Sequence, residues 1–315
     1  MEESQTVGKR PRLGLALGGG GVRGYAHLGV LKALCEAGIP VDVIAGSSMG
    51  AVVGAAFASG YRIDEMIDIA LEMRWRRLFS LADPTIPRQG VIVGNRLGRY
   101  FNTLTGGREF DQLEKSLIVV ATDIATGEEV RINSGLVAQA LRASTAVPGI
   151  FCPVRSGERL LVDGSIAAAV PAAAAGEAGS DVVIAVDVCS PVDRTDVLML
   201  AWKWWQEVPV RPKHHLPGVA GCRRLLNAVL PESVNIVGRS LELYCRNFNT
   251  SPPAAFPITM HYWLLKPAVE DVRWYEFHRG RECIRAGEVV GRQVAEQVSG
   301  FLKARDRAET KERCS

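Results

Sequence analysis

Short apolar segments alternate with segments of helical periodicity along the chain. Residues 13–17 form a brief apolar run beside glycines, as expected of a strand buried on both faces. Apolar positions between 25 and 37 recur with helical spacing and stop before Gly38. A second buried strand is predicted at 41–45, followed by a helix of small residues at 49–59. Because strands and helices alternate, we predict a parallel sheet covered by helices.

The same alternation continues toward the C-terminus. Further strands are predicted at 117–122, 159–162, 181–188 and 262–265, and further helices at 136–143, 171–178 and 278–303. We therefore predict a single α/β domain over residues 12–305. Residues 191–257 are rich in proline and contain no clear strand, so they are expected to form a helical insertion or cap. The charged ends, 1–11 and 306–315, are expected to be flexible tails.

Composition narrows the classes of function. The net charge is only +3, and no basic stripe with interleaved aromatics is present, which argues against nucleic-acid binding. Seven scattered cysteines without a CxxC pair give no basis for a zinc site and favour a reducing, cytoplasmic compartment. No apolar run reaches about 18 residues, so no membrane-spanning helix is expected. Glycine is the exception: six of the 32 glycines lie between Gly14 and Gly24.

The glycine cluster follows the first predicted strand. Residues 19–24 (Gly-Gly-Gly-Val-Arg-Gly) match the G-x-G-x-x-G pattern of dinucleotide-binding loops. That interpretation requires an acidic residue at the end of the second strand. Asp42 has a suitable spacing but stands at the start of that strand. The motif alone is weak evidence, and a simple tight turn between strand and helix is a serious alternative explanation of the glycines.

A second motif occurs between the next strand and helix. Residues 46–50 (Gly-Ser-Ser-Met-Gly) fit G-x-S-x-G in the strand–turn–helix context of a nucleophile elbow. Such a pattern arises by chance in a glycine-rich chain, but chance rarely supplies the right context. We therefore predict that Ser48 is a nucleophile. Gly46 and Gly50 would let the strand and the helix approach closely.

The two motifs are chemically complementary. Acyl transfer through a serine creates a tetrahedral oxyanion that needs preorganised N–H donors. A glycine-rich loop at a helix N-terminus offers free amides and the positive end of the helix dipole. We expect Gly19, Gly20 and Gly21 to form this oxyanion hole, with the amide of Met49 as a further donor.

A serine nucleophile also needs a base. None of the five histidines (His27, His214, His215, His261 and His278) has the sequence context of a triad partner. Asp163 ends an apolar strand and is followed by Gly164, which is also consistent with an ordinary turn. Because sites assemble at the carboxyl ends of parallel strands, Asp163 is expected on the same edge as Ser48. A carboxylate is a weak base unless burial raises its pKa, so Asp163 is predicted to be largely buried.

Taken together, the motifs resemble those of the patatin-like phospholipase family, especially its bacterial members. The resemblance covers about residues 12–190. It rests on 15–27, 46–50 and 163–164, and is strengthened by 120–123, 126–127 and 143–151. It implies a three-layer α/β/α sandwich with a mainly parallel central sheet, and hydrolysis of lipid esters without a metal or cofactor.

The resemblance also implies roles for individual residues. Ser48 and Asp163 would form a catalytic dyad, with the oxyanion hole in the glycine loop. The residues that would support these motifs are Arg23, Gly24, Gly46, Gly50 and Gly164.

Two positions depart from the usual family pattern. Ser165 follows Asp163-Gly164 where the family usually has glycine or alanine. An asparagine commonly found shortly afterwards is absent from 166–171, where Ala168 and its neighbours are apolar. Serine is small enough to preserve the turn, but the missing amide predicts weaker activity or an unusual substrate.

The remaining features leave alternatives open. Trp202, Trp204 and Trp205, with Lys203 among them, would suit peripheral contact with the inner membrane surface or an ordinary cap helix. A Ser-His-Asp esterase would instead use His261 or His278 as its base. The third alternative is a catalytically weak, lipid-binding regulatory protein.

Overall fold

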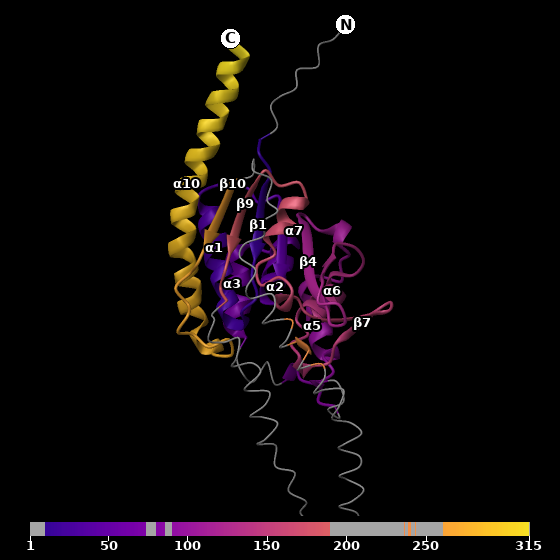
Figure 1. Ribbon diagram of the computed structural model, residues 1–315. Helices are drawn as coiled ribbons and strands as arrows, with labels where there is room; N and C mark the ends of the chain where they lie inside the picture. Colours follow the sequence, from indigo (N-terminus) through magenta and orange to yellow (C-terminus); the bar gives the residue numbers. More distant parts are fainter. Residues whose placement is uncertain are drawn as a thin grey trace, which may run out of the picture.

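A mixed eight-stranded sheet forms the centre of the molecule (Figure 1). The computed structural model describes residues 10–73, 80–85, 90–189, 236, 239–240, 243 and 261–314. The strands are β1 (Leu13–Leu17), β2 (Val43–Ser47), β4 (Ser116–Asp123), β5 (Glu129–Ile132), β7 (Val154–Ser156), β8 (Arg159–Asp163), β9 (Val182–Val186) and β10 (His261–Leu265). Their order is β10-β9-β1-β2-β4-β8-β7, with β5 also paired to β4.

Five neighbouring strands, from β10 to β4, run parallel, whereas β5, β7 and β8 pair antiparallel. β3 (Gly90–Ile92) and β6 (Gly149–Phe151) form a separate two-stranded sheet. β1, β2 and β9 are buried along their whole length, which explains their continuous apolar sequences.

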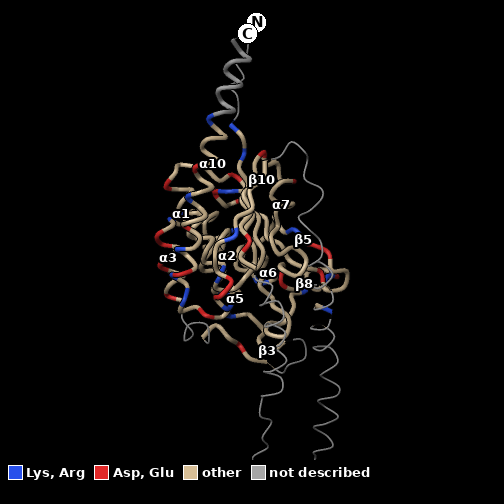
Figure 2. Tube along the Cα trace, turned by 60° about the vertical axis from the view of Figure 1, so that its left-hand side comes forward, with Lys and Arg blue, Asp and Glu red and all other residues tan. Residues whose placement is uncertain are grey.

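Helices cover both faces of the sheet, so the architecture is a three-layer α/β/α sandwich (Figure 2). The helices are α1 (Ala26–Glu36), α2 (Met49–Ala58), α3 (Ile63–Glu72), α5 (Asn95–Leu104), α6 (Val137–Ser144), α7 (Ala172–Glu177) and α10 (Gly280–Cys314). Leu13, Leu15 and Leu17 belong to the core formed with α1 and α2, whereas Ala16 packs toward α7. This division follows from the two-residue period of a strand.

Glycines allow the layers to pack closely. A Cβ at Gly54 of α2 would come within 2.8 Å of the Ile44 side chain in β2. The longest helix, α10, lies beside α1 (Figure 1) and contacts it through Gly287 and Gly291.

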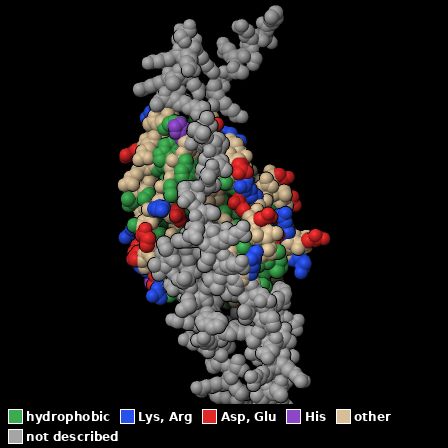
Figure 3. All heavy atoms as spheres, viewed as in Figure 1, with side chains coloured by type: hydrophobic (Ala, Val, Ile, Leu, Met, Phe, Trp, Pro, Cys, Tyr) green, Lys and Arg blue, Asp and Glu red, His purple; other side chains and the backbone are tan. Residues whose placement is uncertain are grey.

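Basic and acidic side chains are interspersed over the described part of the face in Figure 3.

The predicted strands and helices are present, with shifts of a few residues at their ends, and the three-layer fold is confirmed. α10 continues to Cys314 instead of ending at Lys303, because no glycine or proline interrupts the good helix formers in 304–314. Helices α3 and α5 were not predicted. The predicted insertion at 191–257 lies outside the described residues, except for Ile236, Arg239, Ser240 and Leu243.

Candidate active site

Ser48 occupies a sharp turn between β2 and α2. Its φ of 50° and ψ of −120° make it the only non-glycine residue with positive φ among the described residues. A Cβ at Gly46 would lie 2.5 Å from Ala51 Cα, and one at Gly50 would lie 2.1 Å from the Leu17 carbonyl oxygen. Only glycine therefore fits on either side of the turn, and the turn holds Ser48 in a strained conformation.

Ser48 is hydrogen-bonded directly to a buried carboxylate. Its Oγ donates to Oδ2 of Asp163 at 2.7 Å. Asp163 is only 5% exposed, which confirms the expected burial. Burial raises the pKa of the Asp163 carboxyl above its ordinary value, and hydrogen bonds from Ser165 and Ser48 offset part of that rise. A buried carboxyl with a raised pKa is a better proton acceptor than a solvated one.

Asp163 reaches Ser48 by a different route from the one expected. We expected Asp163 at the end of a parallel strand, but β8 runs antiparallel to β4. Ser47 pairs with Val120 of β4, and Asp163 pairs with the next residue, Ala121. Asp163, at the end of β8, and the turn that carries Ser48 therefore lie on opposite sides of β4, beside neighbouring residues of that strand. The expected strand direction was therefore wrong, although Asp163 does lie beside Ser48 as expected.

Ser165 holds the second oxygen of this carboxylate. Its Oγ donates to Asp163 Oδ1 at 2.6 Å, and its backbone N–H donates to the same oxygen at 2.9 Å. A Cβ at Gly19 would lie 2.1 Å from Ser165 Oγ, so the glycine loop passes directly over this hydroxyl. The residue that departs from the usual family pattern is thus in direct contact with Asp163.

The glycine loop leads from β1 into a short 3-10 helix, Gly21–Tyr25, and then into α1. The N–H of Gly19 donates to the Ala169 carbonyl at 3.0 Å, so it is already engaged. The N–H groups of Gly20, Gly21 and Met49 donate to no other group in the described part of the chain. All three residues line the same cavity as Ser48. The arrangement therefore offers unused backbone donors beside the serine.

Buried groups beneath the loop hold its backbone. His27 Nε2 lies 2.7 Å from the Gly18 carbonyl oxygen. Burial lowers the pKa of His27 to about 4, so the ring is neutral at neutral pH. This contact fixes the backbone at the start of the loop.

The three remaining motif residues also lie at the site. A Cβ at Gly24 would lie 2.5 Å from Met49 Cγ, so the loop packs closely against the start of α2. Arg23 is buried and lines the cavity. Gly164 packs against the Val120 carbonyl oxygen, from which a Cβ would lie 2.1 Å away.

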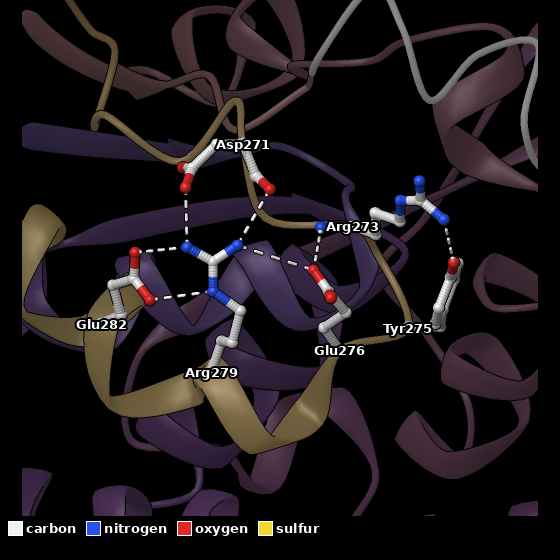
Figure 4. Close-up of polar contacts among 6 residues, drawn as sticks. All are labelled: Asp271, Arg273, Tyr275, Glu276, Arg279 and Glu282. Atoms are coloured by element: carbon white, nitrogen blue, oxygen red, sulfur yellow. Dashed lines mark hydrogen bonds and ion pairs between the residues drawn. The ribbon is translucent and has the colours of Figure 1, made fainter.

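A C-terminal segment supports the loop from the other side. The Trp274 carbonyl accepts a hydrogen bond of 2.8 Å from the Val22 N–H. The segment is folded around Arg279, which binds the Asp271 side chain at 2.6 Å and Glu282 at 2.6 and 2.9 Å (Figure 4). Glu276 also accepts from the Arg273 N–H. No sequence signal pointed to this segment, since it lies far beyond the recognised motifs.

Ser144 is another contact that the sequence did not predict. Its Oγ accepts a hydrogen bond of 2.8 Å from the backbone N–H of Ser48. Ser144 is completely buried at the end of α6. It belongs to the 143–151 motif, so the resemblance marked its surroundings but assigned it no role.

A cavity of about 460 Å³ opens beside Ser48. Its walls are mainly apolar and come from α2, α3, α5, the 147–151 segment and the C-terminal segment. The buried guanidinium of Arg142 anchors one wall by donating to the carbonyls of Gly94 and Cys152 at 3.1 and 2.8 Å. A volume of this size accommodates a small organic ligand or part of a lipid.

The other candidate groups lie elsewhere. His261 begins β10, at the opposite end of the parallel strands from Ser48, and packs on Phe301. His278 is exposed, and no histidine is among the described residues that line the cavity. Asp42 binds Arg10 at the amino end of β1, away from the glycine loop. The candidates Trp202, Trp204, Trp205, His214 and His215 lie outside the described residues.

Comparison with known proteins defines the family. The family model for patatin-like phospholipase matches residues 15–175, and the chain belongs to this family. It is 40% identical over 178 residues to an uncharacterized NTE family protein of Mycobacterium tuberculosis H37Rv, covering 56% of this chain and 49% of that protein. It is 34% identical over 189 residues to lysophospholipase nte1 of Emericella nidulans, covering 58% of this chain and 12% of that protein.

The chain thus spans about half the length, or less, of these curated relatives. Among solved structures, VipD of Legionella pneumophila matches with a TM-score of 0.44 and 15% identity, over 91% of this chain and 67% of that one. In the described residues, no helix has the length and apolar character needed to cross a membrane.

Proposed function

We propose that this protein is a serine acyl hydrolase that cleaves carboxylic esters of lipids through a Ser48–Asp163 dyad. The observation that carries the proposal is the 2.7 Å hydrogen bond between Ser48 Oγ and Asp163 Oδ2 at the end of an apolar cavity. Membership of the patatin-like phospholipase family and the similarity to a lysophospholipase support the choice of lipid esters as the substrate class.

The first step forms an acyl-enzyme. Ser48 Oγ attacks the ester carbonyl while its proton passes to Asp163 Oδ2. The carbonyl π electrons move onto the oxygen, giving a tetrahedral oxyanion. When this intermediate collapses, the bond to the leaving alcohol breaks and the alcohol takes the proton from Asp163. The same hydrogen bond thus serves both proton transfers.

Backbone N–H groups would stabilise the oxyanion. Gly20, Gly21 and Met49 are the proposed donors because their N–H groups are unused in the described structure and their residues line the cavity with Ser48. Gly19 contributes by lacking a side chain, which leaves room for the Ser165 hydroxyl. Loss of one such donor typically costs about 10²–10³ in rate.

The second step releases the fatty acid. A water molecule attacks the acyl carbonyl and gives a proton to Asp163. The second tetrahedral intermediate collapses, the bond to Ser48 Oγ breaks, and that oxygen recovers the proton from Asp163. The enzyme is then in its initial state.

The test is a lipid hydrolysis panel combined with labelling by a fluorophosphonate probe. Ser48→Ala should abolish both labelling and turnover. Asp163→Asn should lower turnover by about 10²–10⁴, the usual contribution of a general base. Ser180→Ala is a matched control, because the hydroxyl of this buried serine donates to the Ala175 carbonyl near the far end of the sheet, away from Ser48.

Other outcomes distinguish the alternatives. A folded His278→Ala or His261→Ala variant without turnover would contradict the dyad and favour a histidine base. Lipid binding without turnover or Ser48 labelling would instead identify a regulatory protein. Because Ser165 and Ala168 depart from the usual family pattern, lipid binding should be measured alongside turnover.

A further inference from the structure

Three helices surround the deep part of the cavity. α2 contributes Met49, Val52, Val53 and Ala56, which follow one another along a single helix face from the end that carries Ser48. α3 and α5 contribute apolar side chains from several successive turns each. The cavity therefore extends from Ser48 along α2, and we call the part between α2, α3 and α5 the tube.

A second, smaller pocket of about 270 Å³ lies where these helices meet again. It is lined by Ser59 and Gly60 just beyond α2, Glu65 in the first turn of α3, and Thr105 just beyond α5. Its lining is therefore more polar than that of the tube. Because Ser48 is at the other end of α2, this pocket lies beyond the far end of the tube.

Leu104 separates the two spaces. Of the described residues, it alone lines both the apolar cavity and the small pocket. Its side chain is only 7% exposed and belongs to the central core, at the last position of α5. The Leu104 side chain is therefore the part of the wall that the two spaces share among the described residues.

We propose that Leu104 closes the acyl-binding tube and sets the longest acyl chain that the site accepts. This inference rests on the proposed hydrolase function and adds to it the determinant of chain length. From Ser48 to Ala56 the tube follows about 12 Å of helix. An extended chain advances about 1.2 Å per bond, so this length holds about ten carbons.

Removal of the leucine should lengthen the tube as far as Ser59, which adds about 4 Å along α2. That length corresponds to about three further carbons. Each additional methylene group that becomes buried raises the affinity for the acyl chain several-fold. Three buried methylenes should therefore raise the rate with the longer chain, relative to the shorter one, by at least about tenfold.

The experiment measures the rate of Ser48 labelling with alkyl fluorophosphonates from butyl to hexadecyl, supported by hydrolysis of the matching p-nitrophenyl esters. The wild type should react best near decyl and decline with longer chains. Leu104→Ala should move the optimum about three carbons upward. Leu34→Ala is the matched control, since it makes the same truncation at a buried position on α1 outside the cavity.

A second variant keeps the test decisive if Leu104→Ala does not fold. Ala56→Leu adds bulk inside the tube, so it should move the optimum to shorter chains while butyl labelling persists. A profile that is the same in wild type and in the folded tube variants would overturn the role of Leu104. Absence of labelling with every probe in the folded wild type would instead contradict the proposed hydrolase itself.

Discussion

At the scale of single residues, the environment of Asp163 determines its chemistry. One oxygen accepts from Ser48 and the other accepts twice from Ser165. Burial raises the pKa of the Asp163 carboxyl, and among the hydrogen bonds that lower this pKa, the one from the Ser165 hydroxyl has the largest effect. Ser165 thus fixes which oxygen faces Ser48, and it keeps more of the carboxyl ionised than burial alone would.

Replacement of this hydroxyl should change the pH profile. In the proposed mechanism Asp163 must be ionised to act as the base, so kcat/KM should be high above the pKa of Asp163 and fall as the pH drops through it. Ser165→Ala removes a hydrogen bond that lowers this pKa, so the acidic limb should move to higher pH. On that limb, activity should fall by about 10- to 100-fold, since a hydrogen bond to a charged group contributes about 1.5–3 kcal/mol. An unchanged acidic limb, measured from kcat/KM against pH, would contradict this role for Ser165.

At the scale of elements, the contact between α1 and α10 depends on small residues. A Cβ at Gly29 would lie 2.0 Å from the Ile284 carbonyl oxygen, and one at Gly287 would lie 1.9 Å from that of Ala26. α1 begins directly after the glycine loop. The close approach of α10 therefore helps to fix the helix that carries this loop.

Two glycines of α10 provide a matched comparison. Gly300→Ala meets no neighbour within 4 Å and should raise the free energy of unfolding by up to about 1 kcal/mol through helix propensity. Gly287→Ala forces the helices apart and should lower it by about 1–3 kcal/mol. Urea denaturation of both variants measures the difference. Equal effects at the two positions would show that the close packing at Gly287 is not needed for stability.

At the scale of the whole molecule, the folded core extends well beyond the family match at 15–175. β9 and β10 complete the sheet, and the segment around Arg279 supports the glycine loop. Cys283, Val294 and Val298 of α10 are buried in the same core as β1. Residues outside the recognised family region are therefore part of its core and its site.

A chain ending at Met260 tests this conclusion. It lacks β10, the Trp274 carbonyl and α10, so the buried face of α1 would be exposed to water. We expect loss of cooperative thermal unfolding and no fluorophosphonate labelling of Ser48. A truncated chain that unfolds sharply and is labelled at the wild-type rate would show that the C-terminal part is dispensable.

The short-range features of the site could be predicted from sequence because their geometry is encoded within a few residues. Apolar runs and helical periodicity predicted most strands and helices, and glycines on either side of Ser48 predicted the turn. The contacts that join these parts could not be predicted in the same way. Ser48 and Asp163 are 115 residues apart, and their meeting depends on the register of an antiparallel strand that no local pattern encodes.

The same limit applies to Ser144, Trp274 and Leu104. Each belongs to an ordinary local segment and acquires its place in the site only when distant helices and strands pack together. Local backbone preferences thus specify the serine turn and the glycine loop. Long-range packing specifies the partner of Asp163, the support of the loop and the shape of the tube, because these depend on which surfaces become buried against one another.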